Sequence, residues 1–137
     1  MNIYTDGSCL KNPNGPGGWG VLILDKECEW EISGNNPSTT NNIMELQAVI
    51  EAIKFVTEKQ LIIHSDSTYV IKGITEWIEN WIKRDWKKVK NSELWKELYL
   101  LVQDKDIEWK WVKAHANNKY NNRVDEIARN CAKEILC

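Results

Sequence analysis

The sequence predicts an α/β fold in which a five-stranded mixed β-sheet carries helices on both faces. Near the start of the chain, short runs of apolar and β-branched residues are separated by turns, which is typical of a three-stranded antiparallel meander. Further along, apolar residues recur at a spacing of about 3.6, as on one face of a helix. A later strand-like run follows the first helical segment. It is most simply parallel to the first strand, because crossover connections are right-handed and return to the same sheet.

The first three strands are expected close together in the chain. Residues 2–5 form the first strand, which ends at Asp6. The segment Lys11–Gly18 is rich in turn-forming residues and is expected to be a loop. Trp19–Leu24 is continuously apolar, as in a strand covered on both faces, whereas residues 28–33 alternate apolar with polar side chains. That alternation predicts a half-exposed strand at the edge of the sheet.

The remaining elements are expected to alternate between helices and strands. The first helix is entered through residues 39–42 and has the apolar stripe Leu46, Val49, Ile50 and Ile53. A strand at 61–64 follows, and residues 65–67 open the next helix. Further helical faces lie at 77–82 and 94–102, then a strand at 107–111 and a last helix with its apolar stripe at 124–135.

The length of 137 residues fits a single domain over residues 1–137. The chain opens directly on a strand and contains no apolar run of membrane-spanning length, so we expect a cytoplasmic protein with no membrane partner. The four cysteines show no metal-binding spacing and are interpreted as reduced thiols, with one disulfide left open as an alternative. They are Cys9, Cys28, Cys131 and Cys137.

Charge is unevenly distributed along the chain. The formal net charge is −2, yet the segment Lys83–Lys90 holds five basic residues and one acid, a local charge of +4 that leaves −6 for the rest. This asymmetry suits a protein that grips a polyanion with one segment and holds a metal with another. The alternative is an ordinary solvated basic face.

Four acids occupy the ends of strands or the starts of helices. Asp6 and Asp66 each follow a strand, and adjacent parallel strands would bring them together at the carboxyl edge of the sheet. Glu45 and Asp125 are expected in the first turns of their helices, beside small alanines. Each acid also has an ordinary explanation: a turn residue for Asp6, a capping box from Asn42 for Glu45, a helix N-cap for Asp66 and the helix dipole for Asp125.

Taken together, the four acids favour a metal site over four separate explanations. Carboxylates that lie close repel each other, so some take up protons unless cations neutralise them. Mg²⁺ or Mn²⁺ prefers oxygen ligands and keeps positions open for water and phosphate. Two such ions about 4 Å apart activate a water and stabilise the leaving oxygen of a phosphodiester.

Six motifs resemble, in order and spacing, those of the type 1 ribonuclease H (ribonuclease HI) family: YTDGSC, TTNNIMEL, SDSTYV, GITEWIENW, WKWVKAHA and RVDEIA. The resemblance extends from Tyr4 to about Ala132. It implies that Asp6, Glu45, Asp66 and Asp125 bind two Mg²⁺ ions, with Mn²⁺ as a possible substitute.

The same resemblance implies the reaction and its setting. Members of the family are endoribonucleases that cleave the RNA strand of RNA–DNA hybrids and leave 5′-phosphate and 3′-hydroxyl ends. We therefore expect a monomeric hydrolase that binds such hybrids, with no separate hybrid-binding domain.

The two histidines receive different interpretations. His115 lies where the family has a loop histidine assigned to proton transfer or product release, and its near-neutral pKa suits either role. The alternative is a solvated loop residue, and its neighbour Ala114 replaces a glycine found in many relatives. His64 lies within a strand and is interpreted as structural.

Several residues match the family's substrate contacts. The basic segment resembles a substrate-gripping protrusion, several residues shorter here, whose phosphate contacts would add affinity without reading sequence. In a pocket for a DNA phosphate, Ser38 replaces an arginine common in relatives. Thr68 stands where many relatives have glutamine. The expected contacts are Gly7, Ser8, Cys9, Asn12, Thr40, Asn41, Asn42, Thr68, Trp77, Lys87, Lys88, Lys90 and Asn91.

Two other functions are compatible with parts of the pattern. A catalytically silent hybrid-binding module would keep the fold but would not need the full set of acids. A different nuclease or an integrase would share strand-end acids on a similar sheet. Such proteins usually lack the TTNNIMEL pattern and the tryptophan-lysine segment, so the ribonuclease H interpretation is preferred.

Overall fold

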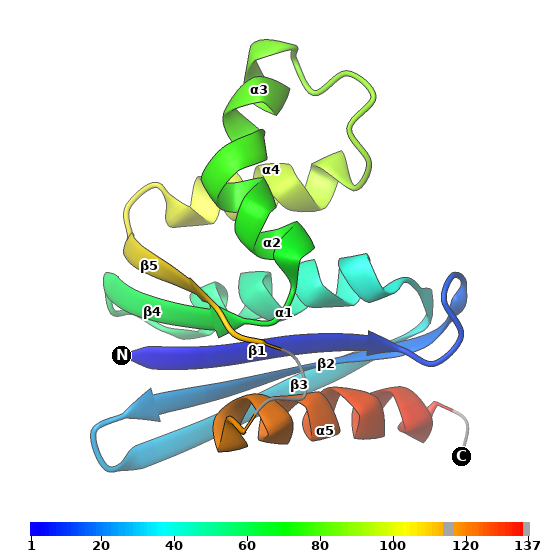
Figure 1. Ribbon diagram of the computed structural model, residues 1–137, viewed down its shortest axis with the longest axis vertical. Helices are drawn as coiled ribbons and strands as arrows, with labels where there is room; N and C mark the ends of the chain where they lie inside the picture. Colours follow the sequence, from blue (N-terminus) through cyan, green and yellow to red (C-terminus); the bar gives the residue numbers. More distant parts are fainter. Residues whose placement is uncertain (114–116, 136–137) are drawn as a thin grey trace.

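The computed structural model describes residues 1–113 and 117–135, and Figure 1 shows their arrangement. Five strands form one sheet in the order β3-β2-β1-β4-β5. The antiparallel part consists of β1 (Asn2–Cys9), β2 (Gly15–Asp25) and β3 (Cys28–Thr39). The strands β4 (Gln60–Ser65) and β5 (Asp106–Trp111) continue the sheet in parallel with β1. The predicted mixed sheet, its meander and its edge strand are confirmed.

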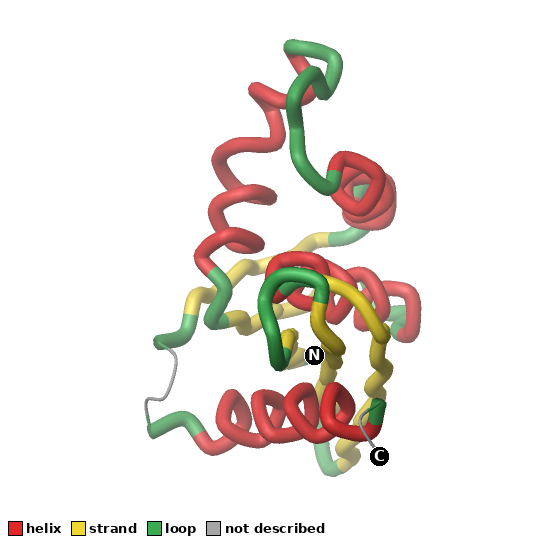
Figure 2. Tube along the Cα trace, turned by 90° about the vertical axis from the view of Figure 1, so that its right-hand side faces the viewer, coloured by secondary structure: helices red, strands yellow, loops and turns green. Residues whose placement is uncertain are grey.

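Helices cover both faces of the sheet. The helix α1 (Asn41–Phe55) lies on one face and α5 (Lys119–Glu134) on the other, as Figure 2 shows. A continuous helical segment runs through α2 (Thr68–Lys72), the π-helical stretch η1 (Gly73–Trp77) and α3 (Ile78–Lys83). It is followed by α4 (Ser92–Val102), which packs on α1. In Figure 1, α3 and the loop after it project away from the sheet.

Alternation along β1 supplies apolar side chains to both layers. Ile3 belongs to the larger core, which also contains Val49 of α1 and the wholly buried Trp95 of α4. Tyr4, the next residue of β1, joins a smaller cluster with Val124 of α5. Since neighbouring side chains of a strand point to opposite faces, one short strand anchors both helical layers.

The first three strands are longer than predicted. The strand β1 continues to Cys9 and β2 begins at Gly15, because Gly7–Cys9 pair in antiparallel register with Gly17–Trp19. The glycine-rich sequence predicts a loop for this part of β2, and the structure corrects that expectation. Gly18 has a packing role instead: a Cβ there would lie 2.3 Å from the Ala128 carbonyl oxygen of α5. The edge strand β3 is also longer than expected and ends at Thr39.

The first helix begins within its predicted entry at residues 39–42, whereas the last helix begins earlier than predicted. Thr40 is the N-cap of α1, and its hydroxyl accepts a hydrogen bond from the Ile43 backbone N–H. Asn118 is the N-cap of α5, so the asparagine-rich run after it is helical rather than a loop. Glu45 and Asp125 therefore lie beyond the first turns in which they were expected.

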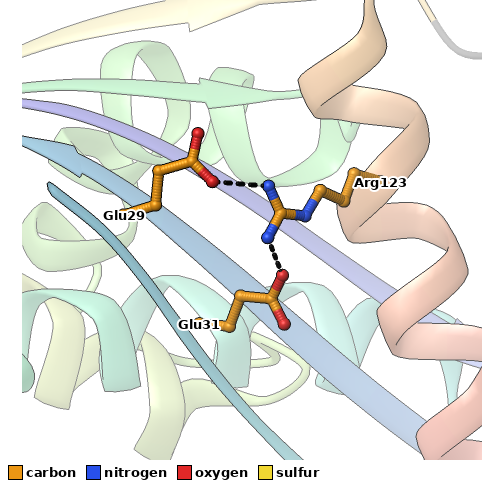
Figure 3. A network of polar contacts seen from close by, with 3 residues as sticks. All are labelled: Glu29, Glu31 and Arg123. Carbon is orange, nitrogen blue, oxygen red and sulfur yellow. Dashed lines mark hydrogen bonds and ion pairs between the residues drawn. The ribbon is translucent and has the colours of Figure 1, made fainter. Parts of the chain in front are cut away.

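An arginine fork links α5 to the edge strand. Arg123 donates through Nη1 to Glu29 (2.7 Å) and through Nη2 to Glu31, as Figure 3 shows. Exposed ion pairs add little stability, but a planar guanidinium between two carboxylates favours one orientation of its helix. A second link is the Asn35 side-chain amide, which donates to the Cys131 carbonyl (3.1 Å). These contacts help to fix the position of α5 and of the acid that it carries.

Two further expectations concern the cysteines and membranes. Cys9, Cys28 and Cys131 are free thiols, whereas Cys137 lies outside the described residues. Within residues 1–113 and 117–135, no helix is both long enough and apolar enough to cross a membrane.

The close approach of α5 to β2 predicts the effect of a single methyl group. Gly18→Ala places a Cβ against backbone atoms of α5, which cannot rotate away, so we expect a loss of about 1–3 kcal/mol in the free energy of unfolding. Gly34→Ala is the matched control, since its Cβ meets only the ring of Trp19, a side chain that can move. Urea denaturation measures both variants. Equal losses in the two variants would contradict the expected backbone clash.

Candidate metal and nucleic-acid site

Three carboxylates from three elements meet at one edge of the sheet. Asp6 belongs to β1, Glu45 to α1, and Asp66 directly follows β4. Each offers an oxygen, and these oxygens all lie within 4.8 Å of one another. Asp6 and Glu45 are 3% and 8% exposed. The parallel pairing of β1 with β4 stops at Thr5, so both aspartates come directly after the shared ladder, as the sequence predicted.

A glycine allows Glu45 to reach this cluster. A Cβ at Gly7 would lie 2.3 Å from the backbone nitrogen of Glu45, so only glycine lets α1 approach β1 this closely. The Gly7 backbone N–H donates to Asp6 Oδ1 (2.9 Å) and also to Glu45 Oε1. The capping-box alternative for Glu45 is wrong, because Thr40 caps α1 and the Glu45 carboxylate accepts from another element.

The N-cap alternative for Asp66 is also wrong. Ser67 caps α2, and its hydroxyl accepts a hydrogen bond from the Val70 backbone N–H (3.2 Å). The Asp66 carboxylate is therefore not used to cap the helix. It instead lies with Asp6 and Glu45, in the gap between the end of β4 and the start of α2.

Asp125 approaches from the opposite layer. It lies beyond the first turn of α5, where the helix dipole contributes little, so that alternative does not explain its position. Arg129 pairs with it, with 3.1 Å between Nη2 and Oδ2. Asp125 is not part of the three-acid cluster, but it lies near enough to raise the pKa of Asp6.

Burial and crowding make the cluster reluctant to ionise. Burial raises the pKa of Asp6 to about 8, a hydrogen bond with Glu45 opposes this rise, and the charges of Asp66 and Asp125 add to it. Burial also raises the pKa of Glu45 well above its usual value, helped by Asp6 and Asp66 and opposed by the Gly7 N–H. Crowded carboxylates whose protons can be replaced by a cation are the donor set that suits Mg²⁺ or Mn²⁺.

A polar hollow of about 330 Å³ lies between the β1–β2 connection, the start of α1 and the residues just before α4. Cys9 of β1 donates its backbone N–H to Asn41 Oδ1 (2.7 Å), and the Asn41 N–H donates to Asn12 Oδ1 (3.1 Å). Asn91 has a left-handed backbone with φ of 60°, and its side-chain amide donates to the Tyr69 hydroxyl (3.2 Å). The residues that line this hollow, called here the asparagine hollow, are Asn12, Pro13, Thr40, Asn41, Asn42, Lys90 and Asn91.

The asparagine hollow therefore unites six of the predicted substrate contacts. Among the others, Thr68 lines a separate hollow beside Trp111. Trp77 is 39% exposed on the projecting helix, with its ring 6.1 Å from that of Trp81. Lys87 and Lys88 are exposed in the loop after α3 and do not line the asparagine hollow, although Lys90 of the same loop does.

The structure gives different outcomes for Ser38, which replaces an arginine common in the family, and for the two histidines. Ser38 donates its hydroxyl to the Asn14 carbonyl (3.2 Å) and does not line the asparagine hollow. His115 lies outside the described residues. His64 stacks on Tyr4 with ring centroids 4.2 Å apart, and its Nε2 lies 3.0 Å from Asn2 Oδ1. Burial lowers the pKa of His64, which fits the predicted structural role.

Two residues of the site were not identified from the sequence. The Tyr69 hydroxyl accepts from both Asn91 and the Trp95 indole (2.8 Å), so it supports the asparagine hollow from the core. Trp111 donates its indole N–H to the backbone carbonyl of Asp66 (3.2 Å). No local signal distinguishes either aromatic from an ordinary packing residue.

Comparison with known proteins places these features in one family. The RNase H family model matches residues 1–133. The chain is 48% identical over 138 residues to a ribonuclease H of Xanthomonas campestris pv. campestris, covering 96% of this chain and 91% of the relative. It is 52% identical over 133 residues to a ribonuclease H of Ehrlichia canis, covering 93% and 90% of the two chains.

Solved structures agree with the sequence matches. The crystal structure of LC9-RNase H1, described as a type 1 RNase H with the type 2 active-site motif, has a TM-score of 0.87 and 32% identity. The match covers 97% of this chain and 72% of that one. LC11-RNase H1 in complex with an RNA/DNA hybrid shares the fold, with a TM-score of 0.75, 21% identity and 99% of each chain covered.

The raised pKa of Asp6 predicts how pH affects the ion-free protein. Between 3.8 and about 8, folded Asp6 holds its proton while the unfolded chain releases it, so stability should fall as pH rises through this range. In the Asp6→Asn variant, stability should fall less steeply with pH. Near pH 8 this variant should melt at a higher temperature than the wild type. Thermal melting in a metal chelator measures this, with Asp104→Asn, an exposed acid, as the control. An unchanged pH slope in Asp6→Asn would contradict the assignment.

Proposed function

Because the chain belongs to the ribonuclease H family, we propose that it is an endoribonuclease that hydrolyses the RNA strand of RNA–DNA hybrids. The observation that carries this proposal is the cluster of Asp6, Glu45 and Asp66, whose oxygens lie within 4.8 Å of one another. A silent binding module would gain nothing from burying such mutually repelling groups.

The four acids would hold two divalent ions, Mg²⁺ or in its place Mn²⁺. The donor set fits, because the raised pKa values of Asp6 and Glu45 reflect repulsion and burial that a cation would offset. When bound, such ions supply an activated water and neutralise charge on the leaving oxygen. The chain itself fixes the geometry: the Gly7 N–H holds Glu45, and Asp125 enters from the other layer.

Strand choice must come from groups outside the metal ligands, since phosphates are the same in RNA and DNA. The backbone of Gly7–Cys9 extends β1 beyond its parallel neighbour and lies beside Glu45, where an RNA 2′-hydroxyl can be recognised. The asparagine hollow, with Thr40 and Asn91 in its wall, would receive the DNA backbone. Asn41 joins the two regions through its hydrogen bond from Cys9.

The projecting segment would add affinity. Lys87 and Lys88 are exposed there, and Trp77 lies on the same projection, so a long hybrid that reaches from the acids could contact them. Such contacts neutralise phosphates without reading the sequence. His115 would assist proton transfer or product release. Residues 1–137 would act as one catalytic domain, as a cytoplasmic monomer.

A substrate panel tests the reaction itself. With Mg²⁺, we expect internal cleavage of the RNA strand of a hybrid, products with 5′-phosphates, and no cleavage of matched duplex RNA or duplex DNA. Asp66→Asn should abolish cleavage while melting at or above the wild-type temperature, because it relieves repulsion within the cluster. Gel analysis of end-labelled strands gives the result. Cleavage of duplex DNA at the rate of the hybrid would instead favour the alternative nuclease.

The basic projection is tested through salt dependence. Replacing Lys87 and Lys88 with alanine should lower the slope of log affinity against log salt by about one unit per lost phosphate contact. Cleavage at saturating substrate should change much less. The double variant of Lys26 and Lys59 removes the same charge from exposed positions outside the projection and serves as the control. If both double variants keep the wild-type slope of log affinity against log salt, Lys87 and Lys88 form only a solvated face.

A further inference from the structure

Three consecutive backbone carbonyls, those of Ser65, Asp66 and Ser67, accept hydrogen bonds from three different donors. The Ser65 carbonyl accepts from the Val112 backbone N–H (2.9 Å), which extends the pairing of β4 with β5. The Ser67 carbonyl accepts from the Ile71 N–H (3.1 Å), which is the first hydrogen bond of α2. The carbonyl of Asp66 lies between these two ladders. A protein donor for it has to come from outside these two ladders.

Trp111 supplies that donor. It is the last residue of β5 and pairs with Ser65 across the sheet, and its indole Nε1 lies 3.2 Å from the Asp66 carbonyl oxygen. Its ring, with four residues of the helical segment, lines a hollow of about 320 Å³. Those four residues are Thr68, Ile71, Lys72 and Glu76. The ring thus bridges the end of β5, the backbone of Asp66 and the start of α2.

Trp111 remains 51% exposed, although it is a large aromatic residue. Burial therefore does not account fully for a tryptophan at this position. Phenylalanine would cover a similar apolar area but would leave the Asp66 carbonyl without this donor. The side chain differs from an ordinary packing residue in this polar contact, which is made to the backbone of Asp66, a residue whose carboxylate belongs to the acid cluster.

We propose that Trp111 is a positioning residue for the metal site: its indole N–H fixes the Asp66 backbone and so aims the Asp66 carboxylate at Asp6 and Glu45. The inference rests on the proposed function, in which Asp66 is a metal ligand. Groups that orient a metal ligand from outside the coordination shell commonly affect metal affinity strongly, even though they never touch the ion. Trp111 is in this sense distinct from the four acids.

The test compares two tryptophans of equal exposure. Trp111→Phe removes the donor, and Trp30→Phe is the control, because Trp30 is also 51% exposed but lies on the edge strand β3. Mg²⁺ binding is measured without substrate, as the rise in melting temperature when MgCl₂ is added. The pH is kept above the pKa of Asp6, which is about 8. Trp111→Phe should need about tenfold more Mg²⁺ for half of the full rise. Trp30→Phe should match the wild type.

Two further measurements separate the possible outcomes. In the wild-type chain, the indole ¹H–¹⁵N signal of Trp111 should move on addition of MgCl₂ while that of Trp30 stays in place. This measurement decides the question even if Trp111→Phe does not fold. An unmoved Trp111 signal, or wild-type Mg²⁺ affinity in folded Trp111→Phe, would overturn the inference. If Asp66→Asn also bound Mg²⁺ as the wild type does, the proposed metal site itself would fail.

Discussion

The crowding of carboxylates at the end of the β1–β4 ladder is the constraint on which the rest of the site depends. Three of them lie within 4.8 Å, and two are almost fully buried, so the fold keeps together groups that repel each other. Gly7 makes this possible in two ways: its missing side chain admits α1, and its N–H is shared between Asp6 and Glu45. The repulsion lowers the free energy of unfolding, and a cation that binds only the folded state raises it again.

The same strand that carries Asp6 also supports the asparagine hollow, which is the proposed binding surface for a polynucleotide backbone. The strand β1 extends beyond the end of its pairing with β4, because Gly7–Cys9 continue to pair with β2. The extension leaves backbone groups of β1 facing the start of α1, and Cys9 binds Asn41 there. Asn41 is held in turn by Asn12 from the β1–β2 connection. The asparagine hollow is thus linked through Asn41 to the strand that carries Asp6.

The sequence was sufficient to predict the sheet, its edge strand and the meeting of Asp6 with Asp66, because parallel strands bring their carboxyl ends to one edge. It was insufficient for the caps. Thr40, Ser67 and Asn118 each stand among several polar residues, and only tertiary packing determines which of them ends the extended chain. The hydrogen bond from Trp111 to Asp66 joins residues 45 positions apart, and no periodic pattern encodes such a contact.

The proposed function divides affinity and selectivity between two parts of the molecule, with Lys90 belonging to both. A chain with net charge −2 has no general attraction for a polyanion, so affinity has to come from the local excess between Lys83 and Lys90. The segment that carries these lysines projects from the sheet in Figure 1, and a lysine interacts with any phosphate equally well. The asparagine hollow has one lysine, Lys90, among uncharged residues, and its amides can only form directed hydrogen bonds. Under the proposed function, discrimination between strands would therefore depend on the surface around Gly7–Cys9 and the asparagine hollow, while the projection would set how tightly the substrate is held.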